Sequence, residues 1–350
     1  MSDVRLENVT KRFGDTVALE DISLQIKDRE FFVLLGPTGA GKTTSLRVIA
    51  GLEKQNSGSV YFDGQSVDSL MPADRDTAFV FQQYSLYPNM SVYDNLAFPL
   101  RSPLRRTPED EIRKRVLEAA EKLRIMHLIE RKTAKLSGGE MQRVSIGRAI
   151  VRNPRIFLMD EPLSNLDAKL RESLRVELKH LQKTQGSTTL FVTHDQIEAL
   201  TMADRIAVLD AGNLLQIGTP HDIYDRPATT FVAQLVGTPR INLLNAHREN
   251  GSLNIAQSDL SVPAPQADTP AEVLVGIRPE DVKPGSGEYR GELVLTEPLG
   301  VETILHIKAG GQTLLSVIPG ASAYRIGENL PFSLAQERLH YFELEGQRIS

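Results

Sequence analysis

The stretch FFVLLGPTGAGKTTSLRVIA, residues 31–50, decides the fold of this chain. Its first five residues form an apolar run typical of a strand covered on both faces. GPTGAGKT, Gly36–Thr43, fits the pattern G-x-x-x-x-G-K-[ST], and a helical pattern with Leu46, Ile49 and Ala50 on its inner face follows directly. Such glycines let the backbone wrap phosphates, with N–H groups and a helix N-terminus facing the negative charge. The order strand, loop, helix predicts an α/β nucleotide-binding core.

Two side chains of this loop are expected to hold a nucleoside triphosphate and its metal ion. Lys42 would reach the β- and γ-phosphates, and Thr43 would give its hydroxyl to Mg²⁺. The predicted nucleotide-binding residues are Gly36, Pro37, Thr38, Gly39, Ala40, Gly41, Lys42, Thr43 and Thr44.

The first 235 or so residues have an α/β pattern around this loop. Further apolar strand-like runs are Thr77–Phe81, Ile156–Met159, Thr188–Val192 and Ile206–Leu209. They predict a central sheet that is covered on both faces. Arg5–Phe13 and Val17–Ile26 alternate apolar and polar residues, which predicts an antiparallel edge sheet, and Lys169–Gln185 has the leucine spacing of a helix that ends at Gly186.

Two parts of the chain differ from this core. Residues 88–149 carry no convincing strand, and Glu109–Glu130 has an apolar helical stripe, so we expect a helical subdomain inserted into the core. After Gly237, short β-type runs separated by Gly, Pro and Asp predict a small all-β, barrel-like domain, with Glu249–Pro270 as a loop within it. The predicted domains are therefore residues 1–237 and 238–350.

Acidic residues and a histidine follow two of the predicted strands. Asp160 and Glu161 end the run RIFLMDEP; Asp160 suits the Mg²⁺ partner of Thr43, and Glu161 suits the base that deprotonates the attacking water. His194 ends the run FVTH at the sheet edge where α/β proteins bind ligands, in reach of a γ-phosphate. Asp195 with Glu198 resembles a helix capping box.

A second glycine loop precedes another helix. In LSGGEMQRVS, Leu136–Ser145, Ser137 can cap the helix and Gly138 and Gly139 leave backbone N–H groups open, which predicts a second anion site. The pattern does not say which anion it serves. Gln82 follows a strand at the start of the helical insert, and composition assigns it no role.

Bulk properties exclude several classes. The net charge of −5 and pI of about 5.9 argue against a large nucleic-acid interface. The chain has no cysteine, so it forms no disulfide and has no thiol ligand. The start, MSDVRLENV, lacks the regions of a signal peptide, and no apolar run approaches the roughly 18 residues that span a bilayer. A membrane role is expected to depend on a partner.

Taken together, these motifs resemble the ATP-binding cassette (ABC) family. Their order along the chain is GPTGAGKT (36–43), the glutamine of VFQQ (82), LSGGE (136–140), IFLMDEP (156–162), SNLD (164–167) and TH (193–194). VFQQYSLYPNMSVYDNLAFPL and VTHDQIEALTMADRIAVLDAG look like ATPase subunits of carbohydrate importers. The tail, with VGIRPEDV and EPLGVE, is similar to the C-terminal β domain of the maltose-importer type.

The resemblance implies roles that the residues alone do not. Phe13 matches an adenine-stacking aromatic, and Gln82 matches a glutamine that senses Mg²⁺ and the attacking water. Asp167 matches the aspartate of a dimer-contacting loop. It also implies Glu161 as catalytic base, His194 as γ-phosphate switch, and a contact from the LSGGE loop to the ATP held by the partner chain. The implied partner-chain contacts are Ser137, Gly138, Gly139, Glu140 and Asp167.

The implied assembly is a homodimer that clamps two ATP molecules with Mg²⁺ and drives two transmembrane permease subunits. It would sit peripherally on the cytoplasmic face of the plasma (inner) membrane and depend indirectly on a periplasmic or extracellular solute-binding protein for a sugar, oligosaccharide or polyol. Glu140 stands where many relatives have Gln, and Met141 replaces a commonly basic residue; the consequence stays open.

Three alternatives remain at this stage. The chain could be a soluble ABC-type ATPase of translation or DNA repair, or an importer ATPase for a non-carbohydrate solute. The β domain could hold the dimer together, or bind a ligand or a regulatory protein. The transported solute is not encoded in any motif of this chain.

Overall fold

A computed structural model describes residues 2–103, 107–266 and 268–349 of the 350-residue chain. It divides into two compact units, Met1–Pro220 and His221–Ser350, which are described separately. Among the described helices, none has both the length and the apolar character needed to cross a bilayer.

A six-stranded sheet forms the centre of the first unit, in the order β10-β9-β3-β8-β7-β6. Five strands are parallel, and β10 pairs antiparallel with β9. The strands are β3 (Phe31–Leu35), β6 (Thr77–Val80), β7 (Ile156–Asp160), β8 (Thr188–Thr193), β9 (Arg205–Asp210) and β10 (Asn213–Gly218). Every residue of β3, β7 and β8 is buried, which confirms the prediction of a sheet covered on both faces.

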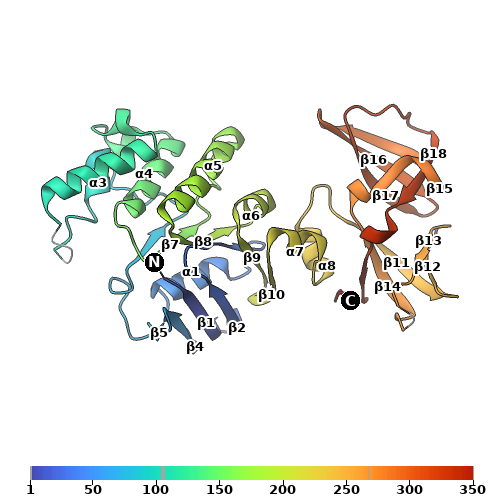
Figure 1. Cartoon of the computed structure of the whole chain (residues 1–350), viewed down its shortest axis with the longest axis horizontal. Helices are drawn as coiled ribbons and strands as arrows, with labels where there is room; N and C mark the ends of the chain where they lie inside the picture. Colours follow the sequence, from blue (N-terminus) through green and yellow to red (C-terminus); the bar gives the residue numbers. More distant parts are fainter. Residues whose placement is uncertain (1, 104–106, 267, 350) are drawn as a thin grey trace. The chain divides into compact units, whose positions relative to one another are not determined.

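A second, antiparallel sheet has the order β2-β1-β4-β5. Its strands are β1 (Val4–Phe13), β2 (Thr16–Ile26), β4 (Ser57–Phe62) and β5 (Gln65–Ser66). Helix α1 (Lys42–Ala50) contacts β7 and β8 on one side and β2 on the other, so it lies between the two sheets. Helices α5 (Ala168–Gln185) and α6 (Gln196–Met202) lie on the other side of the central sheet (Figure 1).

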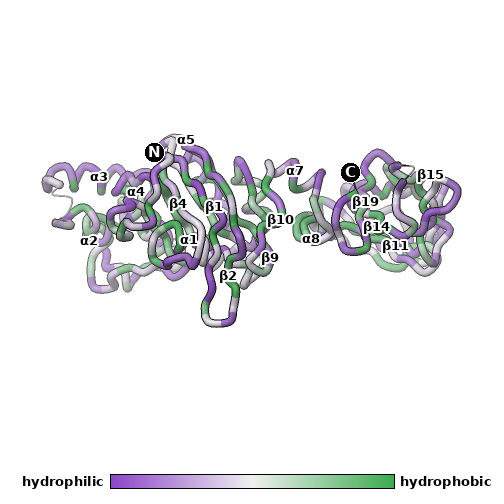
Figure 2. The backbone as a smooth tube through the Cα atoms, turned by 90° about the horizontal axis from the view of Figure 1, so that it is seen from below, coloured by the Kyte–Doolittle hydropathy of each residue, from purple (hydrophilic) through white to green (hydrophobic). Residues whose placement is uncertain are grey.

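The segment between β6 and β7 is helical, as expected. It contains α2 (Val92–Ala97), α3 (Glu109–Lys122) and α4 (Gly138–Ile150). Most of α3 is coloured hydrophilic in Figure 2, and its stripe of Ile112, Val116 and Ala120 is buried.

The prediction that this helix runs to Glu130 was wrong. Helix α3 ends at Lys122 because Arg124 adopts the left-handed region with φ 56°, which a right-handed helix cannot contain. A 3₁₀ turn at Met126–Leu128 follows. The register of the apolar stripe continues past the true end, so periodicity alone overestimated the length.

Antiparallel strands dominate the second unit. One sheet has the order β13-β12-β11-β14-β19 and the other β17-β16-β15-β18, and one hydrophobic core draws on both. The strands are β11 (Asn242–Glu249), β12 (Ser252–Ile255), β13 (Ser261–Pro263), β14 (Glu272–Ile277), β15 (Val282–Pro298), β16 (Glu302–Ala309), β17 (Gln312–Pro319), β18 (Asn329–Leu334) and β19 (His340–Phe342). The expectation of a loop over Glu249–Pro270 was wrong, since β12 and β13 bury Leu253, Ile255 and Val262 there.

Two short helices, α7 (Pro220–Asp225) and α8 (Thr230–Leu235), precede these strands. The predicted boundary at Gly237 places them in the first domain, whereas all of α7 after Pro220 and the whole of α8 lie in the second compact unit. Arg278 gives a physical reason: the residue is 1% exposed, and its guanidinium donates hydrogen bonds to the backbone carbonyls of Ala233, Val236 and Tyr224.

Candidate active site

The glycine loop joins β3 to α1 in the first unit. Gly39 and Gly41 have φ of 85° and 99°, where a side chain would be strained. A Cβ atom on Gly36 would lie 2.2 Å from the carbonyl oxygen of Leu209, and one on Gly41 would lie 2.5 Å from that of Ala18. Gly41 is the N-cap of α1 and no side chain caps this helix. The loop therefore presents an uncapped helix N-terminus, the usual setting of a bound phosphate.

Lys42 is the buried cation of this loop, with only 4% of its surface exposed. Its Nζ donates to the carbonyl oxygens of Gly36 and Pro37 at 2.9 and 2.8 Å and lies 3.7 Å from Oε1 of Glu161. Burial lowers the pKa of Lys42, and the neighbouring Glu161 opposes that shift. The ammonium group is thus held over the loop and beside the predicted base.

Thr43 and Asp160 meet between α1 and the end of β7. The Thr43 hydroxyl donates to Oδ1 of Asp160 at 2.8 Å. Burial raises the pKa of Asp160, while the bond from Thr43 lowers it. Within the residues that the structure describes, no group of three or more His, Asp or Glu side chains could hold a metal. One hydroxyl and one carboxylate fit Mg²⁺, which takes few protein ligands and fills its shell with water and substrate phosphates.

Glu161 follows Asp160 and has φ 44°, the left-handed region. Its N–H donates to the carbonyl of Val192 in β8, which holds the turn against the next strand. Its Oε2 lies 3.1 Å from Nδ1 of His194 and its Oε1 faces Lys42. The structure therefore brings together three residues that lie far apart in the sequence, at the carboxyl ends of neighbouring strands.

The neighbourhood of His194 differs in one detail from the expectation. Asp195 caps α6, accepting from the N–H groups of Ile197 and Glu198. The Glu198 carboxylate, however, accepts from the Thr193 hydroxyl at 2.6 Å, so its bond is to the strand end. Burial raises the pKa of Glu198. The predicted capping box is thus replaced by a bond that only the tertiary fold creates.

Gln82 lies just after β6 and its side chain is exposed. Its Nε2 donates to the Ser164 hydroxyl at 3.4 Å, and that hydroxyl donates to the backbone carbonyl of Glu161 at 2.9 Å. The Asn165 amide donates to the backbone carbonyl of Gln82 at 3.0 Å. Gln82 is thus connected to the Glu161 turn through the segment Ser164–Asp167.

Sequence reasoning assigned no role to Ser164, Asn165 or Arg171. The only signal was their position beside the predicted base, in a segment whose Ser and Asn are also ordinary turn formers. Arg171 donates to the backbone carbonyls of Ser164 and Leu166 and lies 3.5 Å from Asp195.

Phe13 ends β1 and is 47% exposed. The Lys11 ammonium lies 4.6 Å from the centre of its ring. Phe13 pairs with Thr16 across the hairpin that leads into β2, and Ala18 of β2 approaches Gly41. The ring is therefore on the strand pair that borders the loop, with area left for stacking.

The LSGGE loop lies at the start of α4. Ser137 and Glu140 form a capping box: the Glu140 N–H donates to the Ser137 hydroxyl at 3.4 Å, and the Ser137 N–H donates to Oε2 of Glu140 at 2.8 Å. That bond lowers the pKa of Glu140. A Cβ on Gly139 would lie 2.0 Å from Leu170, and Asp167 caps α5 through the N–H of Leu170. α4 packs on α2, α3 and β6, whereas α1 lies between the sheets (Figure 1).

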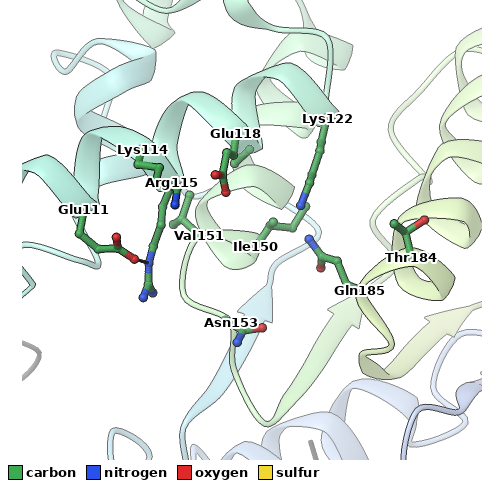
Figure 3. Close-up of a pocket in the computed structure, with 11 residues that line it drawn as sticks. Glu111, Lys114, Arg115, Glu118, Lys122, Ile150, Val151, Asn153, Thr184 and Gln185 are labelled. Atoms are coloured by element: carbon green, nitrogen blue, oxygen red, sulfur yellow. Dashed lines mark hydrogen bonds and ion pairs between the residues drawn. The ribbon is translucent and has the colours of Figure 1, made fainter.

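The open cavities of the first unit include two that differ in their lining. One, of about 370 Å³, is lined by charged residues of α3 and by the ends of α4 and α5, including the pair Glu111–Arg115 (Figure 3). It contains none of the predicted site residues. The other is a groove of about 480 Å³ with exposed apolar side chains, including Leu52, Phe81 and Phe98. This groove borders Gln82 through its neighbour Phe81.

Comparison with known proteins decides the family. The chain is 46% identical over 366 residues to the trehalose/maltose import ATP-binding protein of Thermococcus litoralis, covering 98% of both chains. It belongs to the ABC transporter family. Residues 19–164 of this ABC protein match the ABC transporter model and residues 275–342 match the TOBE domain.

Other relatives agree with this membership. An sn-glycerol-3-phosphate import ATP-binding protein of Agrobacterium fabrum is 46% identical over 358 residues, covering 100% of both chains. A dimeric bacterial ABC transporter cassette is 35% identical with a TM-score of 0.56, covering 62% of this chain and 98% of its own. The predicted family, α/β plus all-β fold class and ATPase activity are confirmed, and ATP is the nucleotide of the family. The roles of individual residues stay predictions.

Proposed function

We propose that this ABC protein is the ATP-hydrolysing subunit of an importer for a sugar, oligosaccharide or polyol, or for a related solute such as a polyol phosphate. The observation that carries the proposal is the position of the Glu161 carboxylate, 3.7 Å from Lys42 and 3.1 Å from His194 beside the glycine loop. The import functions of the relatives support the coupling to solute uptake.

The side chains around the glycine loop suit the hydrolysis of ATP by water. Glu161 accepts a proton from a water molecule while the water oxygen forms a bond to the γ-phosphorus. The bond from that phosphorus to the bridging oxygen breaks, and ADP and phosphate leave. Lys42 balances the charge on the β- and γ-phosphates, and His194 orients the carboxylate and contacts the γ-phosphate. Phe13 stacks on adenine.

Thr43, Asp160 and Gln82 would hold Mg²⁺, which neutralises phosphate charge. Thr43 and Asp160 already share a hydrogen bond, so their oxygen atoms lie together before any ion binds. Gln82 is connected to the turn at Glu161, next to Asp160, through its hydrogen bond to Ser164.

The active form is a homodimer in which each ATP is shared. The loop of one chain binds the phosphates, and Ser137, Gly138, Gly139, Glu140 and Asp167 of the other chain complete the site. Ser137 and Glu140 bond each other in the isolated chain, which supports a preformed surface that waits for the partner's nucleotide.

Two transmembrane permease subunits are the partners that this motor needs. The apolar groove beside Gln82 suits an amphipathic segment of such a subunit, because exposed apolar side chains line it next to the hydrolysis site. A solute-binding protein outside the membrane would select the cargo. The chain would then lie peripherally on the cytoplasmic face, and its β domain would hold the dimer or receive a regulatory protein.

Two measurements test the proposal. Purified protein should release phosphate from ATP only with Mg²⁺, and it should copurify with two hydrophobic membrane subunits. Phe98→Asp in the groove should abolish that copurification and leave ATP hydrolysis by the homodimer without membrane subunits intact. Val176→Asp is the matched control, because Val176 is 65% exposed on α5 and lies outside the groove, whereas Phe98 is 45% exposed. Association with ribosomes or DNA instead of membrane subunits would contradict the proposal.

A further inference from the structure

The turn Ser164–Asp167 makes three hydrogen bonds to two residues of the candidate active site, Gln82 and Glu161. Ser164 contacts the Gln82 amide and the Glu161 carbonyl, and Asn165 contacts the backbone of Gln82. We propose that Asn165 is a positioning residue for ATP hydrolysis, whose side-chain amide holds the Gln82 backbone and so limits where the Gln82 side chain can point. This inference rests on the proposed function.

The Asn165 side chain donates its hydrogen bond directly to the backbone of Gln82. Its Nδ2 donates to the carbonyl oxygen of Gln82 itself at 3.0 Å, although the two residues are 83 positions apart. Gln82 is exposed and lies beyond the last residue of β6, so no sheet hydrogen bond fixes its backbone from that strand. A side chain that holds this carbonyl therefore limits where the Gln82 amide can point.

Asn165 is itself fixed from both sides. Asp167 caps α5, and Arg171 donates to the carbonyls of Ser164 and Leu166 while facing Asp195. The turn is thus tied to the helix after it and to the residue that follows His194. Because these bonds hold the backbone of the turn, the Asn165 side chain can keep the Gln82 carbonyl in one place.

The far end of the Gln82 segment is also held. Ser85 has φ 50°, and its carbonyl accepts from the Arg148 guanidinium of α4 at 2.7 Å. The segment from Gln82 to Ser85 therefore runs between one anchor in the core and one in the helical subdomain. Loss of the Asn165 bond would free the end that carries Gln82.

The test is the steady-state hydrolysis of ATP by Asn165→Ala over a range of ATP and Mg²⁺ concentrations. Loss of one such bond should lower kcat about threefold to tenfold and raise the half-saturating Mg²⁺ concentration, with an unchanged KM for ATP. Asn165→Asp, which keeps the shape and loses the donor, should show the same loss and serves if the alanine variant does not fold. Asn213→Ala is the matched control, because its amide also donates to a backbone carbonyl in an exposed turn, at Ala211.

A double-mutant cycle separates positioning from general damage. In a Gln82→Ala background, Asn165→Ala should cause no further loss of kcat, because nothing remains to be positioned. Additive losses in that cycle, or an Asn165→Ala protein with the kcat of Asn213→Ala, would overturn the inference. A wild-type protein without Mg²⁺-dependent hydrolysis would instead refute the proposed function.

Discussion

Two glycine loops of the chain each precede a helix, and the N-termini of these two helices are capped differently. At α1, the N-cap is Gly41 in a left-handed conformation and no side chain caps the helix, with buried Lys42 directly after it. At α4, Ser137 and Glu140 cap each other's N–H groups. The first terminus has no side-chain cap for its N–H donors, whereas at the second the bonds between Ser137 and Glu140 fix the turn and leave the N–H groups of Gly138 and Gly139 for a ligand.

This difference explains how one nucleotide-binding protein uses two such loops. In the proposed function, the loop at α1 binds the phosphates of its own chain's nucleotide. The loop at α4 is held by the two Ser137–Glu140 hydrogen bonds without any ligand, which suits a surface that is proposed to close on another chain's nucleotide. The Ser137–Glu140 bonds also give Glu140 a local function that Gln would fulfil as well.

The largest expected effect belongs to Glu161, the proposed base beside the first loop. Glu161→Gln should lower hydrolysis about 10²–10⁴-fold, because the amide cannot accept the proton from water. It should still bind ATP and retain it in a closed dimer. Phosphate release and retention of labelled ATP on a sizing column measure the two effects, and Glu172→Gln on the exposed face of α5 is the control. A variant that hydrolyses at the wild-type rate would remove Glu161 from the role of base.

The next largest effect is expected from a substitution in the second loop alone. Ser137→Arg should leave ATP binding at the α1 loop unchanged, since Ser137 lies at the N-terminus of a different helix, α4. It should block closure of the dimer and hydrolysis of ATP. Nucleotide binding by a fluorescent ATP analogue and phosphate release check the pair of outcomes. Hydrolysis that survives this substitution would show that the two loops do not share a site.

Asp160 provides a test in which stability and activity move in opposite directions. Burial raises the pKa of Asp160, so the folded state binds this proton more tightly than the unfolded state. Stability is therefore lost as pH rises from the unfolded pKa through the raised folded pKa, and it stays lower above that window. Asp160→Asn should unfold at higher urea than wild type at pH 7, with a difference that shrinks in acid, and should lose Mg²⁺-dependent hydrolysis.

The control for that test is Asp15→Asn, at an exposed turn, which should change neither property. Equal urea midpoints for Asp160→Asn and wild type at pH 7 would contradict the assignment of a burial cost to Asp160.

The smallest effect concerns the capping box at α4. Glu140→Ala should cost about 1 kcal/mol of unfolding free energy, and Glu140→Gln less, because an amide oxygen can still accept from the Ser137 N–H. The lowered pKa of Glu140 means that its carboxylate contributes stability above the unfolded pKa, and that this contribution is lost as pH falls through the folded value. Urea unfolding at neutral and acid pH measures both, and equal stability of the two variants would contradict the box.

Much of the fold was predictable because apolar runs and glycine loops are local signals. β3 has the predicted bounds, and β8 and β9 extend by one or two residues. The end of α3 was not predictable, because Arg124 leaves the helical region while the apolar stripe continues.

The residues of the candidate site also divide into those that local sequence patterns predict and those that they do not. Lys42, Thr43, Asp160, Glu161 and His194 follow strands or a glycine loop, and the structure brings them together. The positions of Ser164 and Asn165 against Gln82 depend on contacts across 82 and 83 residues, which no local pattern contains. The reciprocal bond of Glu140 at Ser137 has a local signal, the pattern S-x-x-E, so the sequence could have predicted this capping box.

The central claim is that the two loops belong to different sites, and a mixture of two inactive chains tests it most directly. Lys42→Ala removes the first loop's cation, and Ser137→Arg blocks the second loop. In a mixed dimer, the intact α1 loop of one chain meets the intact α4 loop of the other, so a 1:1 mixture should recover about a quarter of wild-type hydrolysis. A mixture as inactive as its two components would contradict the shared site.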